Sequence, residues 1–95
     1  SKYAYVESGT VVMPGARLNA EVRIGRNCII NTNAIVEHNV LVENFCHIST
    51  GAIINGGCKI GEGSFVGSGA VIRNNVEISS NSFIRMGELY KQKSN

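Results

Sequence analysis

Three consecutive six-residue units, AIVEHN, VLVENF and CHISTG, occupy residues 34–51 and decide the fold of this sequence. Each unit begins with a small or compact residue and has an aliphatic residue at its third position. A helix would show a period near 3.6 residues, and a sheet of hairpins would not keep one phase for so long. The period of six therefore indicates a repeat architecture. It continues in both directions without a slip, over fourteen aliphatic positions: Val6, Val12, Leu18, Ile24, Ile30, Val36, Val42, Ile48, Ile54, Ile60, Val66, Ile72, Ile78 and Ile84.

The last position of each unit has the composition of a tight turn. It is Gly or Asn in twelve of the fourteen units, and the exceptions are Glu21 and Phe45. Gly and Asn adopt positive φ at low cost, and Pro14-Gly15 at this place is a type II turn pair. Each unit is therefore predicted to be a four-residue strand followed by a two-residue corner. Its first and third side chains point inward and its second and fourth point outward.

A second period, of 18 residues, groups the units in threes. Strands this short must stack on copies of themselves to pair their backbones, and three strands per turn give a three-sided solenoid. The sequence therefore predicts an all-β, parallel β-helix of four to five triangular coils over residues 1–84, followed by a C-terminal tail over 85–95. One inward column that shows this spacing is Ala16, Ala34, Ala52 and Ala70, and a second is Val22, Val40, Cys58 and Val76.

Composition excludes several other classes of protein. The chain has 95 residues, 17% of them charged, and a net charge of +2, which does not favour a nucleic-acid partner. No apolar run approaches the length of a membrane span, and no signal peptide is evident. The three cysteines, Cys28, Cys46 and Cys58, all fall at inward positions, so we expect core residues in a reducing, cytoplasmic setting.

The outward second positions distinguish the three faces of the predicted prism. We name each face after one member of its outward column. The His47 face and the Ile53 face present apolar stripes, which usually mark a protein interface, whereas the Lys59 face is mixed and charged. The two apolar faces meet at the corners Thr32-Asn33 and Thr50-Gly51, so pointing this edge at a threefold axis predicts a homotrimer. The columns are Val11, Ile29, His47, Phe65 and Phe83; Arg17, Ile35, Ile53 and Val71; and Tyr5, Arg23, Leu41, Lys59 and Glu77.

The sequence contains only two histidines. His38 is predicted at the corner between the Ile53 and Lys59 faces, where an imidazole is free to act as a general base. His47 points outward from the opposite face, so the two rings are far apart within one chain. In the predicted trimer, His38 of one subunit would face His47 of the next, with Asn31 beside it. A solvated surface histidine is the alternative interpretation of His38.

Units such as IGRNCI (24–29) and IGEGSF (60–65) resemble those of the hexapeptide-repeat acyltransferases, whose fold is a left-handed parallel β-helix. A narrower resemblance is to the sugar O- and N-acetyltransferases of bacterial surface-glycan synthesis. This branch includes sialic acid O-acetyltransferases and acetyltransferases of nucleotide-linked amino-sugars. The resemblance covers about residues 3–84 and rests on MPGA (13–16), CIINT (28–32), IVEH (35–38) and HIS (47–49) through Gly56-Gly57.

The resemblance implies acetyl transfer from acetyl-CoA, without a metal, to the hydroxyl or amine of a sugar or nucleotide-sugar. His38 would remove a proton from the acceptor, which attacks the thioester directly. The pantetheine arm would lie along the seam between subunits. The implied site residues are His38 and Glu37 as catalytic, Asn31 and His47 as substrate-binding, and His47, Gly56 and Gly57 as cofactor-binding.

One departure from the family pattern leaves an alternative open. Members usually carry an acid directly after the catalytic histidine, and here that residue is Asn39. A non-catalytic trimeric scaffold, or a degenerate acetyltransferase, is therefore the competing interpretation. A β-helical carbonic anhydrase is disfavoured because its zinc needs three histidines. The resemblance leaves open the acceptor sugar, the choice between O- and N-acetylation, and whether the sequence is part of a longer chain.

Overall fold

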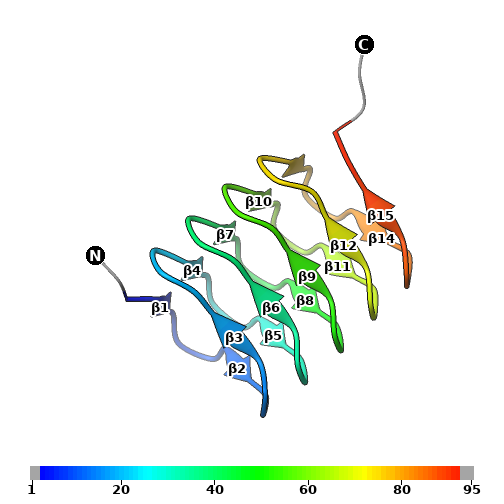
Figure 1. The fold of residues 1–95 in the computed structure, drawn as a ribbon. Coiled ribbons are helices and arrows are strands. Elements are labelled where there is room, and N and C mark those ends of the chain that lie inside the picture. Colours follow the sequence, from blue (N-terminus) through cyan, green and yellow to red (C-terminus); the bar gives the residue numbers. More distant parts are fainter. Residues whose placement is uncertain (1–2, 93–95) are drawn as a thin grey trace.

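The computed structural model describes residues 3–92 as fifteen short parallel strands that form a three-sided left-handed β-helix (Figure 1). The Lys59 face holds β1 (Tyr5–Val6), β4 (Arg23–Ile24), β7 (Leu41–Val42), β10 (Lys59–Ile60) and β13 (Glu77–Ile78). The His47 face holds β2 (Val11–Val12), β5 (Ile29–Ile30), β8 (His47–Ile48), β11 (Phe65–Val66) and β14 (Phe83–Ile84). The Ile53 face holds β3 (Arg17–Leu18), β6 (Ile35–Val36), β9 (Ile53–Ile54), β12 (Val71–Ile72) and β15 (Leu89–Tyr90).

Adjacent strands in every sheet are related by the period of 18 residues. His47, for example, pairs with Ile29 on one side and with Phe65 on the other. The predicted all-β parallel β-helix is thus confirmed, with five strands on each face. Strand β15 pairs with β12 and lies within the segment that the sequence predicts to be a tail. Residues 93–95 of that segment lie outside the described residues.

The corners adopt the left-handed backbone conformation that the repeat predicts. Positive φ occurs at the last position of all fourteen units, in seven glycines and seven other residues. The two exceptions in composition follow the same rule, since φ is 62° at Glu21 and 61° at Phe45. Backbone bonds between coils hold the corners in place, as where Phe45 N donates to Arg26 O at 2.9 Å. Position in the repeat therefore overrides residue type at these two corners.

The core is a stack of the inward side chains. Ala34 and Val36 at the first and third positions of one unit are fully buried, whereas Ile35 between them is only partly buried. The same alternation recurs in the central coils, which confirms the predicted inward and outward positions. No helix within residues 3–92 is long and apolar enough to span a membrane. The prism thus consists of an interior of buried, mostly apolar side chains and three outer faces.

Candidate functional site

His38 lies at the corner that joins β6 to β7, and its side chain is exposed. The corner turns because Asn39 takes a φ of 59°, a conformation that Asn tolerates better than most residues. The main chain here is fixed from both neighbouring coils. Asn39 N donates to Ala20 O at 3.0 Å, and Gly57 N donates to His38 O at 3.1 Å. The exposed imidazole therefore projects from a backbone that is hydrogen-bonded to both neighbouring coils.

The imidazole of His38 is oriented by the amide of the next residue. His38 Nδ1 lies 3.1 Å from Asn39 Oδ1. Because an amide oxygen only accepts hydrogen bonds, Nδ1 must carry the proton in this contact. Nε2 of the neutral ring then holds a lone pair, and it has no hydrogen-bond partner among residues 3–92. This is the tautomer that a general base acting through Nε2 requires.

No hydrogen bond or ion pair joins Glu37 to the imidazole of His38 within residues 3–92. Glu37 Oε1 accepts a hydrogen bond of 2.6 Å from Asn19 Nδ2, one coil earlier on the same face. The carboxylate is partly buried, and within the described residues the partner of His38 is Asn39 instead. Sequence reasoning missed Asn19, although its spacing of 18 residues from Glu37 was available as a signal.

His47 and Asn31 form a second polar group, on the His47 face. Asn31 Nδ2 and His47 Nε2 are 3.3 Å apart. The orientation of the Asn31 amide is set by the main chain, because Thr32 N donates to Asn31 Oδ1 at 2.7 Å. Asn31 Nδ2 is therefore the donor, His47 Nε2 accepts, and the proton of the neutral ring lies on Nδ1. Thr32 was not recognised in the sequence as the residue that fixes this arrangement.

Aromatic rings continue the His47 column toward the C-terminal end. The His47 and Phe65 rings meet edge to face, with centroids 5.1 Å apart, and Phe65 stacks on Phe83 at 5.2 Å. Phe83 is 71% exposed, and His47 and Phe65 are partly buried. The C-terminal part of the predicted stripe on this face is thus a ladder of three rings.

The two histidines lie on different sides of the prism. His38 is at the corner between the Ile53 and Lys59 faces, whereas His47 projects from the third face. Among residues 3–92, no hydrogen bond or ring contact joins His38 to His47 or Asn31. One chain therefore brings together His38, Asn39 and the corner of Gly56 and Gly57, and separately His47, Asn31 and Phe65.

Gly56 and Gly57 form the corner that follows His38 by one coil. Gly57 has a φ of 77°, so it uses the conformational freedom of glycine, whereas Gly56 does not have a positive φ. Gly56 is buried, and its amide N–H has no acceptor among the described residues. A Cβ built on Gly56 would lie 2.9 Å from both Cε1 and Nε2 of His38. The predicted cofactor-binding glycines and the predicted base are therefore direct neighbours.

All three cysteines are buried and free, as the sequence predicts. Cys28 Sγ donates to Glu43 O at 3.1 Å, and Cys58 Sγ donates to Arg73 O at 2.9 Å. Burial raises the pKa of the Cys58 thiol. The side-chain interaction between Cys28 and Cys46 raises the pKa of the Cys46 thiol and lowers the pKa of the Cys28 thiol. Their position in the core supports a structural role rather than a nucleophilic one.

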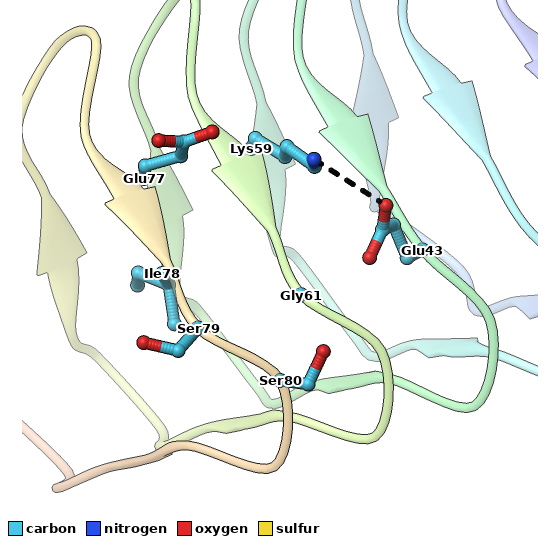
Figure 2. Close-up of a pocket in the computed structure, with 7 residues that line it drawn as sticks. All are labelled: Glu43, Lys59, Gly61, Glu77, Ile78, Ser79 and Ser80. Atoms are coloured by element: carbon cyan, nitrogen blue, oxygen red, sulfur yellow. Dashed lines mark ion pairs between the residues drawn. The ribbon is translucent and has the colours of Figure 1, made fainter.

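Two depressions lie along the Lys59 face and its corner with the His47 face. Figure 2 shows the smaller, of about 210 Å³, in which Lys59 points toward Glu43 and the neighbouring strand carries Glu77. The Lys59 Nζ to Glu43 Oε2 distance is 3.7 Å. Gly25 lines the larger depression, of about 480 Å³, and Gly61 the smaller one. Neither contains a residue of the predicted site.

Within the described chain, no group of three or more His, Cys, Asp or Glu side chains could hold a metal ion.

Comparison with known proteins supports the assignment of the repeat. Residues 39–74 match the family model described as bacterial transferase hexapeptide (six repeats). No curated protein matches the sequence significantly. The resemblance to hexapeptide-repeat proteins, indicated by the sequence, is thus confirmed, and residues 39–74 carry the repeat of this family.

Solved structures similar to this chain include several acetyltransferases. One is a mutant of perosamine N-acetyltransferase from Caulobacter crescentus in complex with CoA and GDP-perosamine, with a TM-score of 0.80 and 27% identity over 94% of this chain and 46% of that one. The acetyltransferase domain of PglB from Neisseria gonorrhoeae has a TM-score of 0.68 and 29% identity, over 97% of this chain and 48% of its own. Its complex with acetyl coenzyme A has a TM-score of 0.67 and 29% identity, over 94% and 47%. The chain spans about half the length of these structures.

Proposed function

We propose that this hexapeptide-repeat chain transfers an acetyl group from acetyl-CoA to a hydroxyl or amine of a sugar, with His38 as the general base. The observation that carries the proposal is the state of the His38 ring. Its Nδ1–H donates to Asn39 Oδ1, and its Nε2, in an exposed side chain, has no hydrogen-bond partner within residues 3–92. The similar structures support the class of reaction, because those proteins were crystallised with CoA, acetyl coenzyme A or GDP-perosamine.

The proposed reaction needs one base and one site for the oxygen of the thioester. His38 Nε2 takes a proton from the acceptor as its nitrogen or oxygen attacks the thioester carbonyl carbon. The C–S bond then breaks, CoA leaves as a thiolate, and the imidazolium returns the proton to sulfur. The free N–H of Gly56, next to His38, is the donor that we assign to the developing oxyanion.

The site is proposed to be completed by a second copy of the chain. The His47 and Ile53 faces carry outward apolar residues that are partly buried or exposed in one chain, such as Ile29, Ile53 and Phe65. Packing the Ile53 face of one copy against the His47 face of the next closes a trimer around the corners of Thr32 and Thr50. His38 of one subunit would then lie opposite His47 and Asn31 of its neighbour.

In that seam, each predicted residue has a chemical role. His47 presents Nδ1–H as a donor because its Nε2 is engaged by Asn31. We assign this donor to the acetyl carbonyl or to a carbonyl or hydroxyl of the acceptor. The pantetheine arm would run beside Gly56 and Gly57, and Glu37, held by Asn19, supplies negative charge near the base.

Titration of acetyl-CoA into the purified chain by calorimetry tests the proposal. Binding at about one site per chain, followed by acetyl transfer to an acceptor panel of sialic acid, nucleotide-linked amino-sugars and GDP-perosamine, is the expected result. The panel also separates O- from N-transfer. Absence of binding at millimolar acetyl-CoA would contradict the proposal.

A non-catalytic trimeric scaffold is the second candidate, and the neutral Asn39 favours it. An amide orients an imidazole but cannot stabilise the imidazolium through charge. A stable trimer that neither binds acetyl-CoA nor acetylates any member of the panel is the outcome expected for a scaffold.

A further inference from the structure

Gly56 occupies a corner position at which the other described coils carry side chains. The described residues at intervals of 18 from Gly56 are Ala20, His38, Asn74 and Gln92. Gly56 lacks the positive φ that makes glycine necessary at its neighbour Gly57. Neither the turn nor the backbone conformation therefore explains why residue 56 has no side chain.

The imidazole of His38 supplies the explanation. A Cβ on residue 56 would lie 2.9 Å from both His38 Cε1 and His38 Nε2, closer than real Cβ contacts come, and 3.3 Å from His38 O. The ring occupies the space into which a side chain of residue 56 would project. Cε1 and Nε2 are the ring atoms nearest to the position of that side chain.

We propose that Gly56 is a positioning residue for His38, and that the absence of its side chain creates the seat in which the imidazole rests. The seat fixes the ring from one side, and the bond from Nδ1 to Asn39 fixes it from the other. The catalytic consequence rests on the function proposed above, whereas the seat itself rests only on the geometry of these residues.

A methyl group at position 56 would move the ring by about half an ångström or more. Ordinary van der Waals contact begins at 3.4 Å, so Cε1 and Nε2 must each retreat from 2.9 Å. The imidazole is exposed and can move, so Gly56→Ala should fold. A misplacement of about 1 Å at a reacting atom can cost about 10²-fold in rate, so this smaller displacement of Nε2 is expected to lower the rate by up to that factor.

Nuclear magnetic resonance of the His38 ring in Gly56→Ala tests the seat without relying on activity. We expect its Cε1–H signal to shift while that of His47 does not, and kcat for acetyl transfer to fall by up to about 10²-fold. Gly87→Ala is the matched control. Gly87 has a φ of 68° and open space around its Cβ, so this variant should lose stability but keep the His38 signal and the activity. An unchanged His38 signal in Gly56→Ala would overturn the proposal.

A double-mutant cycle with His38→Ala distinguishes the steric effect of the His38 ring from that of the His38 backbone carbonyl. Gly56→Ala should lower Tm in the parent chain more than in the His38→Ala background, because the ring is then absent. An equal fall in Tm in both backgrounds would show that His38 O, not the ring, excludes the methyl group. This result would refute the proposal that Gly56 forms a seat for the ring. If Gly56→Ala fails to fold, folding of the double variant supports the proposal and its failure to fold opposes it. A chain without acetyltransferase activity that still shows the coupling would refute the proposed function and leave the seat intact.

Discussion

His38 Nδ1 and Asn39 Oδ1 are 3.1 Å apart, so the orientation of the proposed base depends on a neutral amide that belongs to the next residue. The amide selects the tautomer with a free Nε2, as a carboxylate would. It supplies no negative charge to the imidazolium that forms after proton transfer. The His38 ring is thus oriented as a general base requires, but Asn39 stabilises the imidazolium less than a carboxylate would.

We expect Asn39→Asp to raise kcat/KM for acetyl transfer by about tenfold, because a carboxylate keeps the hydrogen bond and adds charge stabilisation of the imidazolium. Asp also tolerates the φ of 59° at this corner. Steady-state kinetics with acetyl-CoA and the best acceptor measure the effect. Asn81→Asp, at a distant corner with a φ of 60°, is the matched control and should have the activity of the parent. No gain in Asn39→Asp would mean that charge at this position does not limit the reaction.

His38→Ala should lower acetyl transfer by about 10²- to 10⁴-fold with little change in thermal stability. The side chain is exposed, and its hydrogen-bond partner within residues 3–92 is the exposed Asn39, so few stabilising contacts are lost. Activity assays and thermal unfolding of the same preparation provide both readouts. A large fall in Tm would identify His38 as a structural residue instead.

The period of six was sufficient to predict the corners, including those whose residue types disfavour them. Glu21 and Phe45 have positive φ because the strands on either side, paired with neighbouring coils, fix where the chain must turn. A regular solenoid repeats the same backbone hydrogen bonds in each coil, so a sequence that holds the phase specifies the backbone.

The contacts within the candidate site could not be predicted in this way. The orientation of Asn31 depends on Thr32 N, and the ring of His38 rests on Gly56. These contacts depend on side-chain rotamers that the repeat does not specify. Glu37 illustrates the same limit, since the resemblance implied a catalytic role for it together with His38, whereas its carboxylate accepts a hydrogen bond from Asn19.

The corner at Phe45 leads to a prediction about stability. Phe45→Gly should raise the free energy of unfolding by about 1 kcal/mol, because a left-handed conformation costs an L-residue about 1–2 kcal/mol and costs glycine little. Phe45 is 58% exposed, so removal of its ring loses little buried apolar surface. Chemical denaturation measures the change. Phe45→Ala retains the strained conformation and loses the same ring, so it should not be stabilised. A gain in Phe45→Ala equal to that in Phe45→Gly would mean that the ring, rather than the backbone, is unfavourable.

The ring ladder on the His47 face provides the test of assembly. Phe65 lies between His47 and Phe83, with ring centroids 5.1 and 5.2 Å away. In the proposed trimer this ladder is buried against the Ile53 face of a neighbour. Phe65→Asp would place an unpaired carboxylate in that interface, which costs several kcal/mol at each of three equivalent contacts. We therefore expect sedimentation analysis to show a trimer for the parent chain and a monomer for Phe65→Asp.

Leu41→Asp is the control for this change, because it introduces the same charge on a different face. Leu41 is 37% exposed and pairs with Arg23 and Lys59 on the adjacent strands, so an aspartate there gains basic neighbours. Leu41→Asp should remain trimeric and active, whereas Phe65→Asp should lose acetyl transfer together with assembly, since His38 then has no opposing His47. A Phe65→Asp chain that keeps the mass of the parent would place the interface elsewhere. A monomeric Phe65→Asp chain with full activity would show that one copy suffices for the chemistry.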